Sequence, residues 1–260
     1  MKTVWITGAS SGIGEALAKA YASPNTRLVL SSRRRDELER VGTICKSRGS
    51  EIHIQTIDLG DEASIRQTAA EVLDQVGRID LLINNGGISQ RSKAIDTPIE
   101  LDRKLFEINY FGSVLLTKLV LPSMVEAQSG HIVAISSISG KFGFHLRSAY
   151  AATKHALFGF FETIGLEHYS DNIYTTIVCP GRIQTNISKH ALDKDGKESG
   201  TMDKGLAEGM DVDVCAAKIK RGIDRKKREV LVGKKELLLV YIHKYFPRLF
   251  WKIAPGIDPR

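Results

Sequence analysis

The chain has 260 residues, of which 42% are hydrophobic and 26% charged, the balance of a soluble globular protein large enough for one α/β domain or two small ones. Three widely separated cysteines, Cys45, Cys179 and Cys215, exclude a disulfide framework, predict no metal site and favour a reducing compartment. The net charge is +7, but the basic residues form no stripe interleaved with aromatic side chains, so nucleic-acid binding is not expected.

The first predicted strand covers residues 3–7 and begins at once, so no leader or membrane anchor is expected and a cytoplasmic location is predicted. A glycine-rich turn follows, and then a helix to residue 22. Gly8 permits the tight turn, Gly12 lets the backbone approach a pyrophosphate, and Gly14 lets helix and strand pack closely. The free N–H groups at the helix start suit phosphate. The alternative is a turn without a ligand, but its position after the first strand favours a dinucleotide.

The second predicted strand, residues 27–32, ends in Ser32 and is followed by three arginines. Proteins that bind NAD usually carry an acid here, whereas arginine suits the 2′-phosphate of NADP. We therefore predict NADP(H), with Arg33 as the best single candidate. Arg34 and Arg35 have a second interpretation as solvated residues at a helix start, which is favoured for Arg35.

Polar residues also follow the next two predicted strands, residues 51–57 and 80–83. Asp58 is placed to bind an adenine amino group, or it is only a turn residue ahead of Asp61, the expected N-cap of an amphipathic helix over 63–76. The turn at 84–87 lies at a carboxyl strand end, where ligands bind in open α/β sheets.

A long helical region is predicted over about 100–127, with a break near 109–112. Asn109 in this apolar region is costly to bury unless it is hydrogen-bonded. Either it bonds within its own helix turn, or its carbonyl is free to hold a water near Lys154.

A buried strand over 131–135 leads to Ser137 and then to a helix that begins near residue 148. Tyr150 and Lys154 are four residues apart and share one face of that helix. An ammonium beside a phenol favours the phenolate, so Lys154 is expected to lower the pKa of Tyr150 and make it an acid/base near neutral pH. The alternative is an ordinary surface pair.

The last third of the chain contains strands predicted at 173–179 and 228–232, with Pro180 and Gly181 in a rigid turn after the first. Residues 186–210 are polar and long for a plain connection, which predicts a mobile lid. The C-terminal extension, about 234–255, is aromatic, apolar and interrupted by basic residues. It fits an interfacial helix on an anionic membrane, or a helix packed on its own subunit or a partner subunit, which is favoured. No stretch of it approaches the ~20 apolar residues of a membrane span.

In this order the motifs resemble the short-chain dehydrogenase/reductase family over about nine-tenths of the chain. They are Thr7-Gly8-Ala9-Ser10-Ser11-Gly12-Ile13-Gly14, Asp58, Asn84-Asn85-Gly86-Gly87, Asn109, Ser137, Tyr150-x-x-x-Lys154 and Pro180-Gly181. Gly86, where the wider family has alanine, and the tail resemble the subgroup called dehydrogenase/reductase member seven and seven-B. Animal members of that subgroup carry an N-terminal membrane anchor.

The resemblance implies one three-layer doubly wound Rossmann domain, residues 1–260, with a parallel sheet of about seven strands and helices on both faces. It implies Tyr150 as the general acid/base, Lys154 as the residue that lowers its pKa and binds the nicotinamide ribose, Ser137 as the residue that orients the substrate oxygen, and Asn109 as the holder of a relay water. Ile183 and Thr185 would contact the nicotinamide, and Asn85 the adenosine side. The expected cofactor-binding residues are Gly8, Ser10, Ser11, Gly12, Ile13, Gly14, Ser32, Arg33, Asp58, Leu59, Asn85, Gly86, Tyr150, Lys154, Pro180, Gly181, Ile183 and Thr185.

The predicted function is NADP(H)-dependent hydride transfer to a carbonyl, or from an alcohol. The substrate is expected to be lipophilic: a steroid, a retinoid or an acyl-ketone lipid. The alternative is an NADP(H)-binding sensor or membrane-associated scaffold without turnover. A homodimer or homotetramer is expected through the helices near 100–127 and 148–170, where Leu115, Leu119, Leu157 and Phe161 line either an interface or the core.

Overall fold

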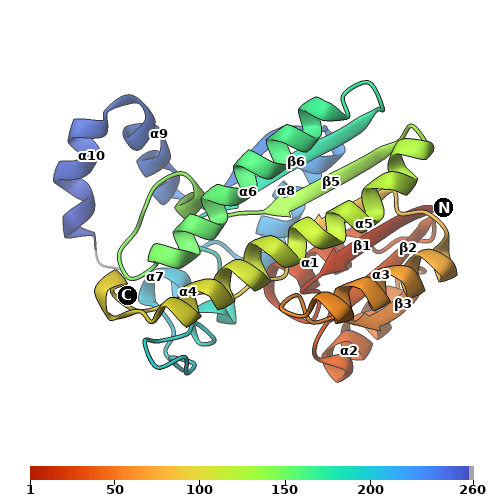
Figure 1. Cartoon of the computed structure of the whole chain (residues 1–260), viewed down its shortest axis with the longest axis horizontal. Coiled ribbons are helices and arrows are strands. Elements are labelled where there is room, and N and C mark those ends of the chain that lie inside the picture. Colours follow the sequence, from red (N-terminus) through yellow and green to blue (C-terminus); the bar gives the residue numbers. More distant parts are fainter. Residues whose placement is uncertain (258–260) are drawn as a thin grey trace.

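The computed structural model describes residues 1–257, and its centre is one seven-stranded parallel sheet between two layers of helices (Figure 1). The strand order is β3-β2-β1-β4-β5-β6-β7, and all neighbours pair in parallel. The strands are β1 (Lys2–Thr7), β2 (Thr26–Ser32), β3 (Glu51–Thr56), β4 (Leu81–Asn84), β5 (Gly130–Ile135), β6 (Ile173–Pro180) and β7 (Glu229–Val232). The predicted doubly wound fold is confirmed, and each predicted strand end lies within one residue of the observed one.

Near-continuous apolar strands form because both faces of the sheet are covered. Successive side chains of a strand point to opposite faces, so Val4 and Ile6 of β1 enter one core while Trp5, between them, enters the other. The first core packs against helices α1 (Gly12–Tyr21), α2 (Arg35–Lys46) and α8 (Val212–Asp224). The second packs against α3 (Glu62–Val76), α5 (Gly112–Glu126) and α6 (Ser148–Glu167).

The predicted break near residues 109–112 is wrong. Helix α4 (Ile99–Phe106) passes through a π-helical turn, Glu107–Phe111, directly into α5. The Gly112 N–H donates to Glu107 O, a wider hydrogen-bond step that keeps the helix continuous. Residues Ile99–Glu126 are long and apolar enough to cross a membrane by length and composition. However, Leu116 and Val120 are fully buried against the sheet, as in the core helix of a globular domain.

The segment at 186–210 and the C-terminal extension lie beyond the carboxyl end of the sheet. The first contains one 3₁₀ turn, Asn186–Ser188, and α7 (Lys204–Ala207). The second forms α9 (Leu238–Tyr245) and α10 (Pro247–Ile253), which stand as a small lobe at one end of the molecule (Figure 1). The inner side of this lobe packs on Phe142 through Val240 and Phe250. The favoured expectation, a tail packed on its own subunit, therefore holds for this inner side.

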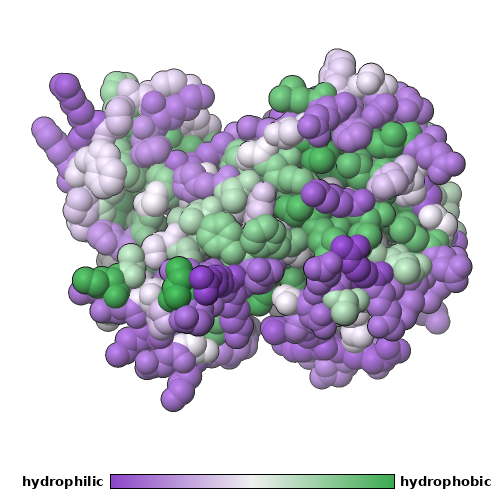
Figure 2. Space-filling view, viewed as in Figure 1, coloured by the Kyte–Doolittle hydropathy of each residue, from purple (hydrophilic) through white to green (hydrophobic). Residues whose placement is uncertain are grey.

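The four apolar residues proposed for a subunit interface divide into two pairs. Leu157 and Phe161 are buried in the second core, while Leu115 and Leu119 are partly exposed and pack against it. Apolar surface gathers over α5 and the adjoining part of α6 (Figure 2).

Because Phe161 is fully buried, Phe161→Ala should cost about 3–5 kcal/mol in the free energy of unfolding through cavity formation. Urea unfolding measures this loss, with exposed Leu166→Ala on the same helix as the control. A loss below about 1 kcal/mol, together with dissociation of an oligomer, would instead place Phe161 in an interface.

Candidate active site

The predicted catalytic residues converge at the carboxyl ends of the central strands. β1 lies between β2 and β4, so the chain reverses its direction of winding at the β1/β4 boundary, where open α/β sheets bind ligands. Ser137 follows β5, and Ser137 and Tyr150 line one pocket together with Gly181 after β6. Lys154 is buried near the Tyr150 ring, and Asn109 is buried against Thr153 of the same helix.

Lys154 is buried one helical turn after Tyr150, with its ammonium 5.7 Å from the centre of the Tyr150 ring. The ammonium donates to Ile135 O at 2.8 Å, at the end of β5. Burial lowers the pKa of Lys154 to about 8, because it disfavours the charged form. The carbonyl of Lys154 accepts from Ser136 Oγ at 2.9 Å, so α6 is tied to β5 at this residue.

The expected lowering of the Tyr150 pKa by Lys154 is corrected by the structure. Burial raises the pKa of Tyr150, and this is the largest effect on it. A hydrogen bond with the Ser137 hydroxyl opposes the rise, as do the positive charges of Arg147 and Arg91. The balance keeps Tyr150 protonated, which suits a proton donor.

Asn109 lies within the π-helical turn, and its side chain is hydrogen-bonded across to the strand-end turn rather than within its own helix turn. Asn109 Oδ1 accepts from Ile88 N at 2.8 Å, while Nδ2 donates to Ile88 O at 3.0 Å and to Thr153 Oγ1 at 3.2 Å. These bonds offset the cost of burying the amide.

Gly87 leaves the space in which Asn109 and Lys154 approach each other. A Cβ at this position would lie 2.9 Å from Asn109 Oδ1 and 3.6 Å from Lys154 Nζ. The Asn109 amide and the Lys154 ammonium therefore both lie next to the empty Cβ position of Gly87. The predicted proximity of Asn109 to Lys154 is present, although Oδ1 already accepts the Ile88 N–H.

Sequence reasoning missed Gln90, a fully buried residue that caps the amino end of α6. Gln90 Oε1 accepts from the backbone N–H groups of Ala149, at 3.0 Å, and Tyr150, at 3.3 Å. Its Nε2 is bonded to three hydroxyl groups, those of Ser92, Thr97 and Ser148. The sequence carries no indication of this capping role, because Gln90 lies about 60 residues from the helix that it caps.

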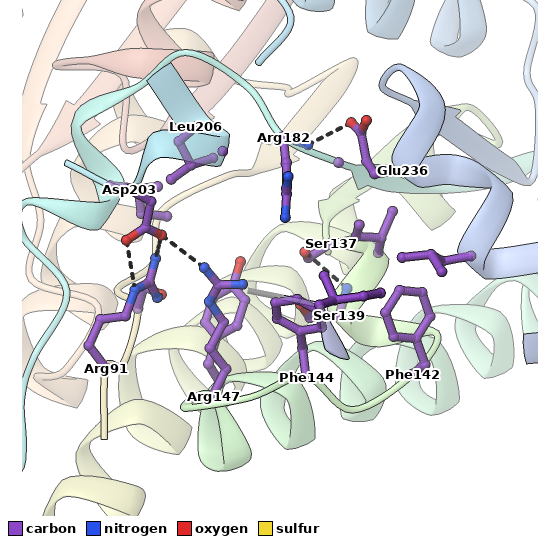
Figure 3. A pocket seen from close by; sticks show the side chains of 18 residues that line it. Arg91, Ser137, Ser139, Phe142, Phe144, Arg147, Arg182, Asp203, Leu206 and Glu236 are labelled. Atoms are coloured by element: carbon purple, nitrogen blue, oxygen red, sulfur yellow. Dashed lines mark hydrogen bonds and ion pairs between the residues drawn. The ribbon is translucent and has the colours of Figure 1, made fainter. Parts of the chain in front are cut away.

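An ionic cluster beside Tyr150 was also missed. Asp203, from the segment predicted to be a lid, pairs with Arg91 and, at 3.0 Å, with Arg147. Figure 3 shows Asp203 facing both guanidinium groups, while Arg182 points into the same pocket from the opposite side. The cluster therefore holds the 186–210 segment against the catalytic helix.

The glycine-rich turn has the form that a phosphate group needs. Gly8 and Gly12 have φ of 64° and 57°, which favours glycine, and Thr185 Cγ2 lies 3.4 Å from the place of a Cβ on Gly12. The α1 N-cap, Ser11, makes no capping hydrogen bond with its side chain, so the first N–H groups of α1 remain available. Asn85 Nδ2 donates to Thr7 O and Gly8 O and fixes the turn. These features fit a dinucleotide pyrophosphate.

Arg34, rather than Arg33, reaches this turn. Arg34 is exposed at the N-cap of α2, as the helix-start interpretation expects, but its guanidinium also donates to Ser10 Oγ at 3.1 Å and Ser11 Oγ at 3.0 Å. Ser32 Oγ accepts from the Arg34 N–H and helps to set its backbone. Arg33 is exposed, and Arg35 pairs with Glu39, as expected for a helix-start residue.

The remaining predicted cofactor residues line the same sheet edge with different local roles. Asp58 Oδ1 accepts from Gly60 N at 2.9 Å, which supports the turn interpretation of Asp58, and Asp61 caps α3 by accepting from Ala63 N. Leu59 is buried, and its Cδ1 would lie 2.5 Å from a Cβ placed on Gly86. Pro180 ends β6, the Gly181 N–H donates to Val232 O, and Ile183 is buried.

A family model described as short chain dehydrogenase matches residues 2–196. The chain belongs to the short-chain dehydrogenase/reductase family. This assignment makes it an oxidoreductase and confirms the resemblance inferred from the motifs.

The relatives and solved structures agree with this assignment. Dehydrogenase/reductase SDR family member 7B of Mus musculus is 42% identical over 255 residues, covering 96% of this chain and 79% of that protein. The SDR family protein 7-like of Drosophila melanogaster is 40% identical over 259 residues, covering 97% and 79%. A short-chain dehydrogenase from Streptomyces avermitilis superimposes with a TM-score of 0.82 at 31% identity, over 99% of each chain. One from Sphingobium yanoikuyae, solved in complex with NADPH, gives 0.80 at 26% identity, over 100% of this chain and 97% of that one.

Removing the Gln90 amide should disturb both the α6 cap and the Tyr150 position. Gln90→Ala leaves two buried N–H groups without their acceptor, which should cost about 1–3 kcal/mol in unfolding free energy. A small shift of the catalytic helix should also lower kcat by about tenfold to a hundredfold. Nicotinamide absorbance and urea unfolding measure the two effects.

Gln90→Glu retains an acceptor at the helix amino end and should recover most of the lost stability, because the three neighbouring hydroxyls can rotate to donate. Exposed Gln67→Ala is the matched control. Wild-type stability and kcat in Gln90→Ala would refute the positioning role.

Proposed function

We propose that this chain is an NADP(H)-dependent oxidoreductase that reduces a carbonyl group of a lipophilic substrate, with alcohol oxidation as the reverse reaction. The observation that carries the proposal is the shared pocket in which Ser137 and Tyr150 meet, with Lys154 buried behind them. Cells generally keep NADPH reduced, so reduction is the expected direction.

Each residue has a defined part in this reaction. When bound, the reduced nicotinamide supplies the hydride that adds to the carbonyl carbon. Ser137 donates a hydrogen bond to the carbonyl oxygen as negative charge develops there, and Tyr150 transfers its phenolic proton to that oxygen. Burial holds Tyr150 in its protonated form beforehand. Burial lowers the pKa of Lys154 to about 8, so near neutral pH it can return a proton to the phenolate that remains.

The choice of NADP(H) is supported by Arg34 at the glycine-rich turn. The Arg34 guanidinium donates to the hydroxyls of Ser10 and Ser11 and therefore lies beside the pyrophosphate turn. A guanidinium at this place is suited to bind the 2′-phosphate of NADP(H). The Sphingobium yanoikuyae enzyme, similar over the whole chain, was solved with NADPH.

The pocket walls support a lipophilic substrate that also has a polar end. Phe142, Phe144 and Leu239 belong to its apolar wall, whereas Arg182 makes no ion pair within residues 1–257. A pure hydrocarbon against Arg182 would desolvate its charge without compensation. Among the three expected classes, this favours a substrate whose polar group can reach Arg182.

Two wider features of the proposal concern assembly and location. The apolar surface over α5 and α6 supports a homodimer or homotetramer built through these helices (Figure 2). Cys45, Cys179 and Cys215 are free and buried, which supports the proposed reducing, cytoplasmic compartment.

Removing the phenolic hydroxyl tests the mechanism directly. Tyr150→Phe should lower kcat by about 10²-fold to 10⁴-fold, because proton transfer is lost, while NADPH affinity stays near that of the wild type. The assay is NADPH oxidation over a panel of lipophilic and small polar ketones, with NADPH binding followed by fluorescence. Retained turnover in the variant would refute the mechanism, and NADPH binding without turnover by the wild type on any ketone would favour the sensor or scaffold function.

Cofactor choice is tested by comparing the three neighbouring arginines. Arg34→Ala should weaken NADPH binding about tenfold to a hundredfold, because one charge-assisted hydrogen-bond donor is lost, and should change NADH binding little. Arg33→Ala tests the candidate chosen from the sequence, and Arg35→Ala, which removes only the contact to Glu39, is the control. Equal losses for NADPH and NADH in both Arg33→Ala and Arg34→Ala would refute the 2′-phosphate assignment.

A further inference from the structure

The C-terminal lobe exposes an unusual amount of apolar surface. Of the fifteen large hydrophobic side chains that are exposed within residues 1–257, seven lie in this short segment. They are Leu238, Tyr241, Tyr245, Phe246, Leu249, Trp251 and Ile253. Trp251 is 70% exposed, and Phe246 is 63% exposed. Such a concentration marks an interaction surface rather than scattered surface residues.

Five of the seven exposed side chains follow the helix period; Phe246 lies at the C-cap of α9, and Trp251 lies about 200° around α10 from Leu249. Leu238, Tyr241 and Tyr245 are spaced i, i+3, i+7 along α9, and Leu249 and Ile253 are spaced i, i+4 along α10. Each helix therefore carries its own outer apolar stripe. Neither stripe is needed to hold the lobe in place, because other residues do so.

The inner side of the lobe anchors it firmly to the body of the protein. Phe250 is 3% exposed, and its ring centre lies 5.2 Å from that of Phe142 and 4.8 Å from that of His243. Val240 of α9 is buried in the same cluster. The outer stripes are thus presented on a fixed support and not on a loose tail.

Positive charge borders these stripes. Lys244, Arg248 and Lys252 directly precede Tyr245, Leu249 and Ile253 in sequence, and none of the three forms an ion pair within residues 1–257. The lobe's acid within that range, Glu236, is turned inward and accepts from the backbone N–H groups of Arg182 and Lys234. The outer surface is therefore both apolar and basic.

We propose that the outer face of α9 and α10 docks on the surface of an anionic membrane. Aromatic and aliphatic side chains flanked by lysine and arginine suit the boundary between headgroups and acyl chains of such a bilayer. A second copy of the chain suits the face less well, because a two-fold contact through it would bring the same basic residues against one another. Docking places the bilayer one helix away from the pocket, since Leu239 of α9 lines the pocket from the inner side of the lobe. If the proposed function is correct, a lipophilic ketone would enter from the membrane on this side.

Trp251 gives a direct signal for the test. The chain has two tryptophans, and the other, Trp5, is fully buried in the core. The full-length protein is mixed with vesicles of phosphatidylcholine alone and with phosphatidylserine added. Flotation with the anionic vesicles is the expected result, and the Trp251 emission shows in addition whether its side of α10 enters the bilayer. Flotation should weaken as salt rises from about 0.1 M to about 1 M, which shortens the screening length from ~10 Å to ~3 Å.

Two exposed-surface variants separate the apolar and charged contributions. The apolar variant combines Tyr245→Glu with Leu249→Glu. The charge variant combines Lys244→Glu, Arg248→Glu and Lys252→Glu. Each variant should weaken vesicle binding about tenfold or more. The matched controls are Leu166→Glu with Tyr169→Glu, which are exposed at the end of α6, and Lys46→Glu with Lys218→Glu and Lys227→Glu. These controls should bind vesicles as the wild type does.

The outcomes for docking and for catalysis are distinguishable. The lobe variants should retain wild-type kcat/KM on a water-soluble ketone, while Tyr150→Phe should still bind vesicles. Absence of flotation for the wild type would overturn the proposal. So would a lobe variant that binds vesicles normally but changes the oligomer mass in light scattering, because the face would then be a contact between copies of the chain.

Discussion

The geometry of this site depends on how the amino end of α6 is held against β5. Two polar side chains, Tyr150 and Lys154, are buried there, and each would be costly without partners. The structure supplies these partners from three directions. Ile135 O accepts the Lys154 ammonium, Ser136 Oγ bonds the Lys154 carbonyl, and Gln90 caps the N–H groups of the first helical turn. The same hydrogen bonds that offset the cost of burying Tyr150 and Lys154 also fix the positions of the reacting groups.

Burial and local charge then set the chemistry of these groups in opposite directions. Removal from water raises the pKa of Tyr150 and lowers that of Lys154, so the neutral form of each is favoured. Arg147 and Arg91 oppose the effect on Tyr150, and both share the carboxylate of Asp203. Since Asp203 belongs to the segment predicted to be a lid, any movement of that segment would change the charge felt by the catalytic phenol.

The sequence was informative where a motif is local and less so where distant side chains meet. Apolar runs located every strand to within one residue, and the Tyr150–Lys154 spacing placed both residues on one helix. Periodicity could not distinguish a break at Asn109 from a π-helical turn, because both disturb the apolar pattern in the same way. Choosing Arg33 over Arg34 failed to anticipate the contact with Ser10 and Ser11, since side-chain reach is not visible in spacing. The Arg91–Asp203 pair joins residues 112 positions apart and left no local signal.

The C-terminal lobe shows why composition alone could not choose between a packed tail and a surface helix. Its two short helices carry more apolar residues than one contact can bury, so one set packs on Phe142 while another remains outside. The packed-tail interpretation therefore describes the inner side of this element, and the outer side is the one proposed to dock on a membrane. The inner side extends the pocket wall through Leu239, and the outer side carries the basic and aromatic residues. If the outer side docks as proposed, this element would connect the membrane surface to the pocket wall through Leu239.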